Sequence, residues 1–71
     1  MKKSFVSKLD LARAYFPHID GDSARHKLIS LIKDDAELLN NLMHSGYNPR
    51  GHYFSPFQLD LIIGRLGNPF N

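Results

Sequence analysis

The stretch Ser23–Lys33, SARHKLISLIK, combines two patterns that bear on the fold and on the function. Its apolar residues recur at the spacing of a helix with one face in a protein core, namely at Ala24, Leu28, Leu31 and Ile32. The other side carries Arg25, His26, Lys27, Ser30 and Lys33, and none of these is acidic. We therefore predict a helix over 23–33. Its outer face is either a DNA-facing recognition surface or an ordinary solvated face.

The sequence predicts three more short helices, because a capping residue precedes each of the segments near 8–15, 35–45 and 56–66. Ser7 stands before the first of these segments, and Asp34 or Asp35 stands before the second. Ser55 is followed by a proline and, three positions after the serine, by a glutamine, which is typical of a helix start. Asp22 is the expected N-cap of the 23–33 helix.

The segment before the last helix is predicted to be a tight turn or a stub hairpin. Gly46 is expected in the left-handed conformation just past the preceding helix, with Tyr47 as its packing contact. Tyr47 and Tyr53–Phe54 would then be two very short extended arms around a turn at Pro49. Residues 1–6 are expected to be a loose basic arm, whose last two residues, Phe5 and Val6, can either pack down on the domain or form a short extended piece.

The apolar positions of these elements supply the expected core. The side chains that we expect to be buried are Leu9, Ala12, Ile19, Ala24, Leu28, Leu31, Ile32, Leu38, Leu39, Leu42, Met43, Phe57, Leu59, Ile62, Ile63 and Leu66. The predicted fold class is all-α. Residues 1–71 would form a compact single domain of four short helices with helix-turn-helix character and a short turn or stub hairpin before the last helix.

The composition is that of a small globular domain with a mildly basic surface. The chain has 71 residues, of which 42% are hydrophobic, and a formal net charge of +2. It contains no cysteine, so neither a disulfide nor a thiolate metal site is available. No apolar run is long enough to cross a bilayer, and no signal-peptide pattern follows the N-terminus. We therefore expect a cytoplasmic location and no membrane partner.

No pattern in the sequence indicates a catalytic or cofactor site. His18, Asp20, Asp22 and His26 match no known zinc-ligand spacing. There is also no Ser-His-Asp arrangement and no glycine-rich phosphate loop. We therefore expect the protein not to be an enzyme, and to bind neither a metal ion nor a small-molecule cofactor.

Cationic and polar residues supply a candidate site for duplex DNA, made of Lys8, Arg25, His26, Lys27, Ser30, Lys33, Arg50, His52 and Tyr53. Arg25 lies near the start of the 23–33 helix, where its guanidinium would reach a guanine edge with two hydrogen bonds. The three lysines would contact phosphates, and the residues after position 49 would touch the backbone or the minor groove. This hypothesis requires the acidic residues of 20–22 and 34–37 to lie to the side, because carboxylates repel phosphates.

The alternative is a protein-interaction module without nucleic-acid contact, acting as an adaptor or through dimerisation. Aromatic residues are numerous for a domain of this size, at Tyr15, Phe16, Tyr47, Tyr53, Phe54, Phe57 and Phe70. Exposed aromatic side chains beside arginine are typical of the centre of a protein interface. A homodimer through the last helix or the Phe54–Phe57 edge would fit this reading, and would also give a DNA-binding protein two half-sites.

Two resemblances follow from the order of these motifs. The D-L-A helix, the S-A-R-x-K-L helix and the Y-F-S-P-x-Q-L helix entry resemble the winged helix-turn-helix of the MerR and phage-excisionase group over Ser7–Ala12, Ser23–Leu28 and Arg50–Leu59. The turn at 16–22 is longer than in that group, and the 35–45 helix is additional. The runs S-K-L-D-L-A-R-A-Y-F-P, S-G-Y, F-S-P-F-Q-L and L-G-N-P are similar, over nearly the whole chain, to a family of short Bacteroidetes proteins with a domain of unknown function. That resemblance implies a shared fold and no known activity.

Overall fold

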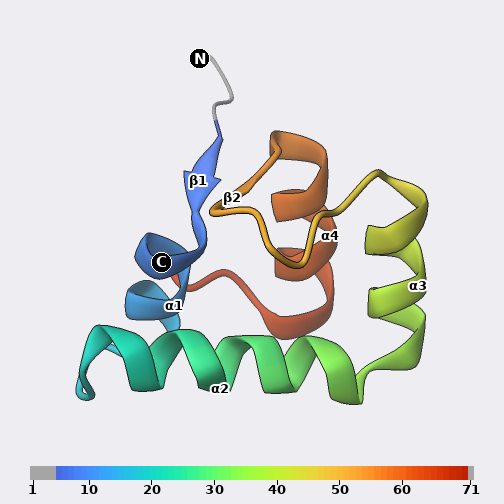
Figure 1. Cartoon of the computed structure of the whole chain (residues 1–71). Coiled ribbons are helices and arrows are strands. Elements are labelled where there is room, and N and C mark those ends of the chain that lie inside the picture. The colour runs from blue at the N-terminus through green and yellow to red at the C-terminus, as the bar shows by residue number, and fades with distance from the viewer. Residues whose placement is uncertain (1–4, 71) are drawn as a thin grey trace.

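The computed structural model describes residues 5–70, which form four helices and two very short strands (Figure 1). The order is β1 (Val6–Ser7), α1 (Lys8–Tyr15), α2 (Gly21–Asp34), α3 (Ala36–His44), β2 (Tyr53–Phe54) and α4 (Pro56–Leu66). In Figure 1, α2 runs along the lower edge, α3 rises from its C-terminal end, and α4 lies between α1 and α3. The prediction of an all-α fold with four short helices is confirmed. Of the predicted basic arm, residues 1–4 lie outside the described residues.

Side-chain caps determine where the helices begin. The backbone N–H of Asp10 donates to Ser7 Oγ at 2.9 Å at the start of α1. At the start of α4, Ser55 and Gln58 exchange both hydrogen bonds of a capping box, at 3.2 and 3.0 Å. These starts agree with the sequence prediction, as does Asp35 at the start of α3.

The predicted cap of α2 was wrong. Asp20, not Asp22, accepts a hydrogen bond from the N–H of Ser23, at 3.2 Å, and the helix therefore begins at Gly21. A Cβ added to Gly21 would lie 2.8 Å from Leu9 Cδ1, so the tip of the exposed Leu9 side chain would have to shift to accommodate a larger residue. The turn between the two helices is shortened to residues 16–20.

The core is a single cluster of buried side chains from all four helices, β2 and the loop before it: Leu11, Ala12, Ala24, Leu28, Ile32, Leu38, Leu42, Tyr47, Phe54 and Ile62. Five side chains that were predicted to be buried are exposed, namely Leu9, Ile19, Leu31, Met43 and Phe57. Leu39, Leu59, Ile63 and Leu66 are half-buried. In α1 the buried stripe consists of Lys8, Leu11 and Ala12, so a lysine occupies a core-facing position. This displaces Leu9 from the core.

The loop between α3 and β2 is not the predicted stub hairpin. β2 pairs antiparallel with β1, with Val6 opposite Phe54 and Ser7 opposite Tyr53, so the partner strand comes from the other end of the chain. Tyr47 belongs to no strand and is buried, with its ring stacked on that of Phe54 at 5.8 Å between centroids. Gly46, at φ +85°, takes the predicted left-handed conformation. The N–H groups of Gly46 and Tyr47 donate to the Met43 and Leu42 carbonyls, which closes α3 with a Schellman motif.

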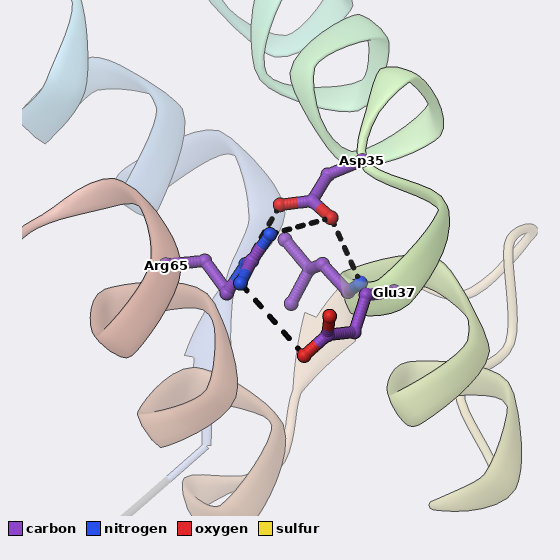
Figure 2. A network of polar contacts seen from close by, with 4 residues as sticks. Asp35, Glu37 and Arg65 are labelled. Carbon is purple, nitrogen blue, oxygen red and sulfur yellow. Dashed lines mark hydrogen bonds and ion pairs between the residues drawn. The ribbon is translucent and has the colours of Figure 1, made fainter.

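An ionic network fixes the corner between α2 and α3 (Figure 2). Asp35 is the C-cap of α2 and also the N-cap of α3, where it accepts a hydrogen bond from the N–H of Leu38 at 3.1 Å. Arg65 of α4 donates to both Asp35 carboxylate oxygens, at 2.8 and 3.1 Å, and lies 3.8 Å from Glu37. The hydrogen bonds from Arg65, followed by the one from Leu38, hold the pKa of Asp35 below its usual value. None of the helices formed by residues 5–70 is long and apolar enough to span a bilayer.

Candidate functional site

An open cleft of about 570 Å³ lies between α2 and the loop before β2. We call it the cationic cleft. It is lined by Lys8 of α1, by Arg25, His26, Ile29, Ser30 and Lys33 of α2, and by Pro49, Arg50, Gly51 and His52 of the loop. Seven of the nine predicted DNA-binding residues therefore line one concave surface. Sequence reasoning missed Ile29, Pro49 and Gly51, which carry no charge that would have pointed to them.

The helical repeat of α2 explains which of its residues line the cationic cleft. Ala24, Leu28 and Ile32 are buried and face the core. Arg25, Ile29 and Lys33 each follow one of these residues, so they lie on one flank of the buried stripe, and His26 and Ser30 continue that flank outward. Lys27 lies on the other flank, with its Nζ 5.5 Å from the centroid of the Phe16 ring, and does not line the cleft.

A tight turn presents the other wall. The N–H of Gly51 donates to the Asn48 carbonyl at 3.0 Å, and the Asn48 side chain accepts from the N–H of Arg50 at 3.0 Å. Asparagine, proline and glycine at positions one, two and four are favoured in such a turn. Arg50 is therefore at the exposed tip, facing α2 across the cleft. The predicted turn at Pro49 is confirmed, although no hairpin flanks it.

Lys8 holds this turn in place. Its backbone N–H donates to the His52 carbonyl at 2.8 Å. Its Nζ donates to the carbonyls of Asn48 and Pro49, at 3.0 and 3.1 Å, and lies 4.6 Å from the centroid of the Tyr47 ring. The lysine is only 4% exposed. Burial, and secondarily the positive charge of Arg25, lower its pKa from the usual value. The expectation that Lys8 contacts a phosphate is therefore corrected, because its ammonium is already bound within the protein.

The acidic residues lie largely away from the cationic cleft. Among residues 5–70, no aspartate or glutamate lines it. Asp20 caps α2, while Asp35 and Glu37 face Arg65. The exception nearby is Asp22, which forms an ion pair with Arg25 at 3.3 Å and lines a smaller adjoining cleft of about 280 Å³ together with Tyr53. Tyr53 is exposed there, outside the cationic cleft.

Beyond Pro49, on the α3 side, the cationic cleft adjoins an apolar groove of about 300 Å³. Ile29 and Ile32 of α2, Leu39 and Met43 of α3 and the ring of Tyr47 line this groove. Ile29, Lys33 and Pro49 line both concavities, so the two lie side by side. In the described range 5–70, no group of three or more histidine, aspartate or glutamate side chains is placed to hold a metal ion.

Comparison with known proteins identifies the family and no activity. No curated protein and no solved structure matches the chain. A family model described as a domain of unknown function, DUF4248, matches residues 2–69, which is nearly the whole chain. This agrees with the resemblance to a family of that description noted from the sequence. The chain therefore belongs to the DUF4248 family.

Proposed function

We propose that this protein binds duplex DNA through the cationic cleft, as a small accessory or regulatory protein of helix-turn-helix character. The observation that carries the proposal is the convergence of Arg25 and Lys33 of α2 with Arg50 of the loop on one concave surface, which no acidic residue of the described range 5–70 lines. A surface of this kind attracts a polyanion, since clefts lined by one sign of charge concentrate the field. The proposal includes a cytoplasmic location.

The residues divide into two roles. Lys33 and Arg50 are exposed and form no ion pair with any of residues 5–70, so they are free to neutralise phosphates. Arg25 is 41% exposed and would leave Asp22 to reach a base edge. His26, Ser30 and His52 are exposed hydrogen-bonding groups between them. Lys8 and Lys27 are left out of the contact set, and Tyr53 would lie at its edge.

The arrangement of α1 and α2 supports the helix-turn-helix part of the proposal. The turn of residues 16–20 is shorter than the sequence predicted and so lies closer to the three or four residues usual for that motif. The loop around Arg50 would take the position of a wing beside the recognition helix. It differs from a wing in construction, since Lys8 and the β1–β2 pair hold it rather than a hairpin of its own.

The test is the salt dependence of duplex binding, measured by fluorescence anisotropy with a labelled random-sequence duplex. Each phosphate neutralised contributes about 0.9 to the slope of log affinity against log salt. We expect the double variant Lys33→Gln/Arg50→Gln to bind more weakly and to reduce the slope by about 2. The matched control is Arg13→Gln/Lys27→Gln, which removes the same charge from outside the cleft and should retain most of the slope. Equal losses in both double variants, or no binding at low salt, would refute the proposal.

A specific observation also favours the alternative, a protein-interaction module. Met43 is 51% exposed and lines the apolar groove. A protein partner could place an apolar side chain in this groove, whereas a DNA duplex has none. Phe57 is likewise exposed, on α4 beside a shallow hollow shared with α3. Sedimentation equilibrium decides whether these side chains support a homodimer: a strictly monomeric protein would remove that form of the alternative.

A further inference from the structure

The apolar groove and the cationic cleft adjoin, and together they make a surface with an apolar half and a cationic half. The floor of the groove is formed by the buried side chains of Ile32 and Tyr47, and its sides by the more accessible Leu39 and Met43. Within the part of the chain that the structure describes, Lys33 is the sole charged side chain lining the groove. Past Pro49, the lining becomes cationic.

We infer that this surface binds an acidic peptide segment of a partner protein, with apolar side chains in the groove and carboxylates against Lys33 and Arg50. The inference goes beyond duplex binding and does not depend on it. It concerns the groove, which nucleic acid leaves unfilled, and uses the cleft only as the adjoining source of positive charge.

Size and charge together select this occupant. A concavity of about 300 Å³ is at the lower limit for small-molecule sites, and it is open on the side of Met43, so it suits one or two apolar side chains better than an enclosed cofactor. Methionine adapts its shape to different apolar partners, which fits a peptide groove. Because the charges at the groove and beside it are positive, a basic peptide would be repelled and an acidic one attracted.

The acidic residues at the start of α3 do not line the groove. On α3, Leu39 and Met43 lie on the flank toward α2, while Glu37 lies on the other flank and faces Arg65. Asp35 is likewise bound by Arg65. Carboxylates of a bound segment would therefore meet cations without competition from acids in the lining.

The experiment uses a synthetic peptide in which a pair of leucines is followed by a run of glutamates, titrated into the full chain and followed by amide chemical shifts in NMR. Two peptide controls replace the leucines by glycines or the glutamates by glutamines. We expect the leucine–glutamate peptide to shift the amide signals of Met43 and Lys33, and both controls to bind much more weakly, since each lacks one half of the recognition.

Matched variants locate the site. Met43→Gln and Lys33→Gln should each weaken peptide binding by roughly three- to tenfold. Leu31→Gln and Lys27→Gln change exposed residues of the same two kinds on α2 but outside the groove, and should leave peptide binding unchanged. All four positions are exposed, so the domain should remain folded, as circular dichroism would verify.

Three outcomes would overturn the inference. The first is equal binding of the glycine–glutamate peptide, which means that the surface takes any polyanion and the groove is unused. The second is absence of binding, or shifts located elsewhere on the domain. The third is self-association of the free protein that Met43→Gln abolishes, which means that a second copy fills the groove. Duplex binding is judged separately, because Met43→Gln removes no charge and should not alter it.

Discussion

Lys8 connects the start of α1 to the loop before β2, and replacing it with methionine tests what its ammonium contributes. Methionine retains most of the length and apolar volume of the side chain, but it cannot donate to the carbonyls of Asn48 and Pro49. It also lacks the positive charge that lies over the rings of Tyr47 and Phe54. Hydrogen bonds from a charged donor contribute about 1.5–3 kcal/mol each, so the gross loss is about 3–6 kcal/mol.

Two effects reduce that loss. Burial and the nearby positive charge of Arg25 both disfavour the charged lysine, which is why the pKa of Lys8 is lowered. The uncharged methionine is free of both costs. The residues that carry the freed carbonyls, Asn48 and Pro49, are exposed, so water can replace part of the lost bonding. We therefore expect Lys8→Met to lower the free energy of unfolding by about 2 kcal/mol. In a domain of this size the melting temperature would fall by roughly 8–16 °C.

The assay combines thermal unfolding by circular dichroism with limited trypsin digestion, because Arg50 lies at the tip of the turn that Lys8 holds. We expect faster cleavage after Arg50 in Lys8→Met than in the unmodified protein under conditions where both are folded. Lys27→Met is the control, since that lysine is exposed and should change stability by no more than about 0.5 kcal/mol. An unchanged or raised melting temperature, with unchanged cleavage, would refute the role assigned to Lys8.

Three further predictions concern the core, the α2–α3 corner and the cleft. Phe54→Ala should cost about 3–5 kcal/mol because the ring is fully buried, and should leave the domain largely unfolded in urea titrations where the exposed neighbour variant Tyr53→Ala stays folded. The lowered pKa of Asp35 means that its ionised form favours the fold. This stabilisation is complete above the usual value of 3.8 and is lost as the pH falls through the lower folded pKa, so the urea midpoint should drop on acidification less in Asp35→Asn than in the unmodified protein. Asp22→Asn should tighten duplex binding about two- to fivefold in anisotropy titrations by releasing Arg25, and weaker binding would contradict the proposed role of that arginine.

Helix positions were readable from the sequence because caps act locally. Ser7 and Ser55 bind backbone N–H groups three residues away, so the relevant geometry lies within one turn. Asp20 and Asp22 were harder to separate, since both are good caps and a single glycine stands between them. In the structure α2 begins at Gly21, where the Leu9 side chain of α1 lies close to it. This tertiary contact cannot be predicted from the local sequence pattern.

Contacts between distant parts of the chain were not readable. Pairing of Val6 with Phe54 depends on the folded arrangement, and two-residue strands have no pattern that specifies a partner. Charged residues are seldom fully buried, so the pattern gives no reason to place Lys8 in the core, and the predicted stripe of α1 includes Leu9 instead. The available signal for a buried Lys8 was its position three residues before Leu11 and four before Ala12, which places it on the same face of the helix. It becomes informative only when acceptors for the ammonium are known.

In the candidate site, too, the features that depend on local sequence were predictable and those that depend on contacts between distant segments were not. The cations of α2 followed from the helical period, and Arg50 from its place in a polar turn. Their convergence on one cleft depends on the hydrogen bonds of Lys8 to the turn and on the β1–β2 pair, neither of which was predicted. The groove was missed because Met43 and Leu39 were assigned to the core, where their apolar character alone would place them.

Asp35 is the C-cap of α2 and the N-cap of α3, so the relative direction of these two helices depends on it. The same residue forms an ion pair with Arg65 of α4. The two long sides of the apolar groove belong to those same two helices. We therefore expect that replacing Arg65 would change the angle between α2 and α3, and with it the width of the groove, although Arg65 is not part of the lining. If the groove binds the proposed peptide and the peptide prefers one width, reciprocity requires that the peptide and the Arg65–Asp35 ion pair strengthen or weaken each other.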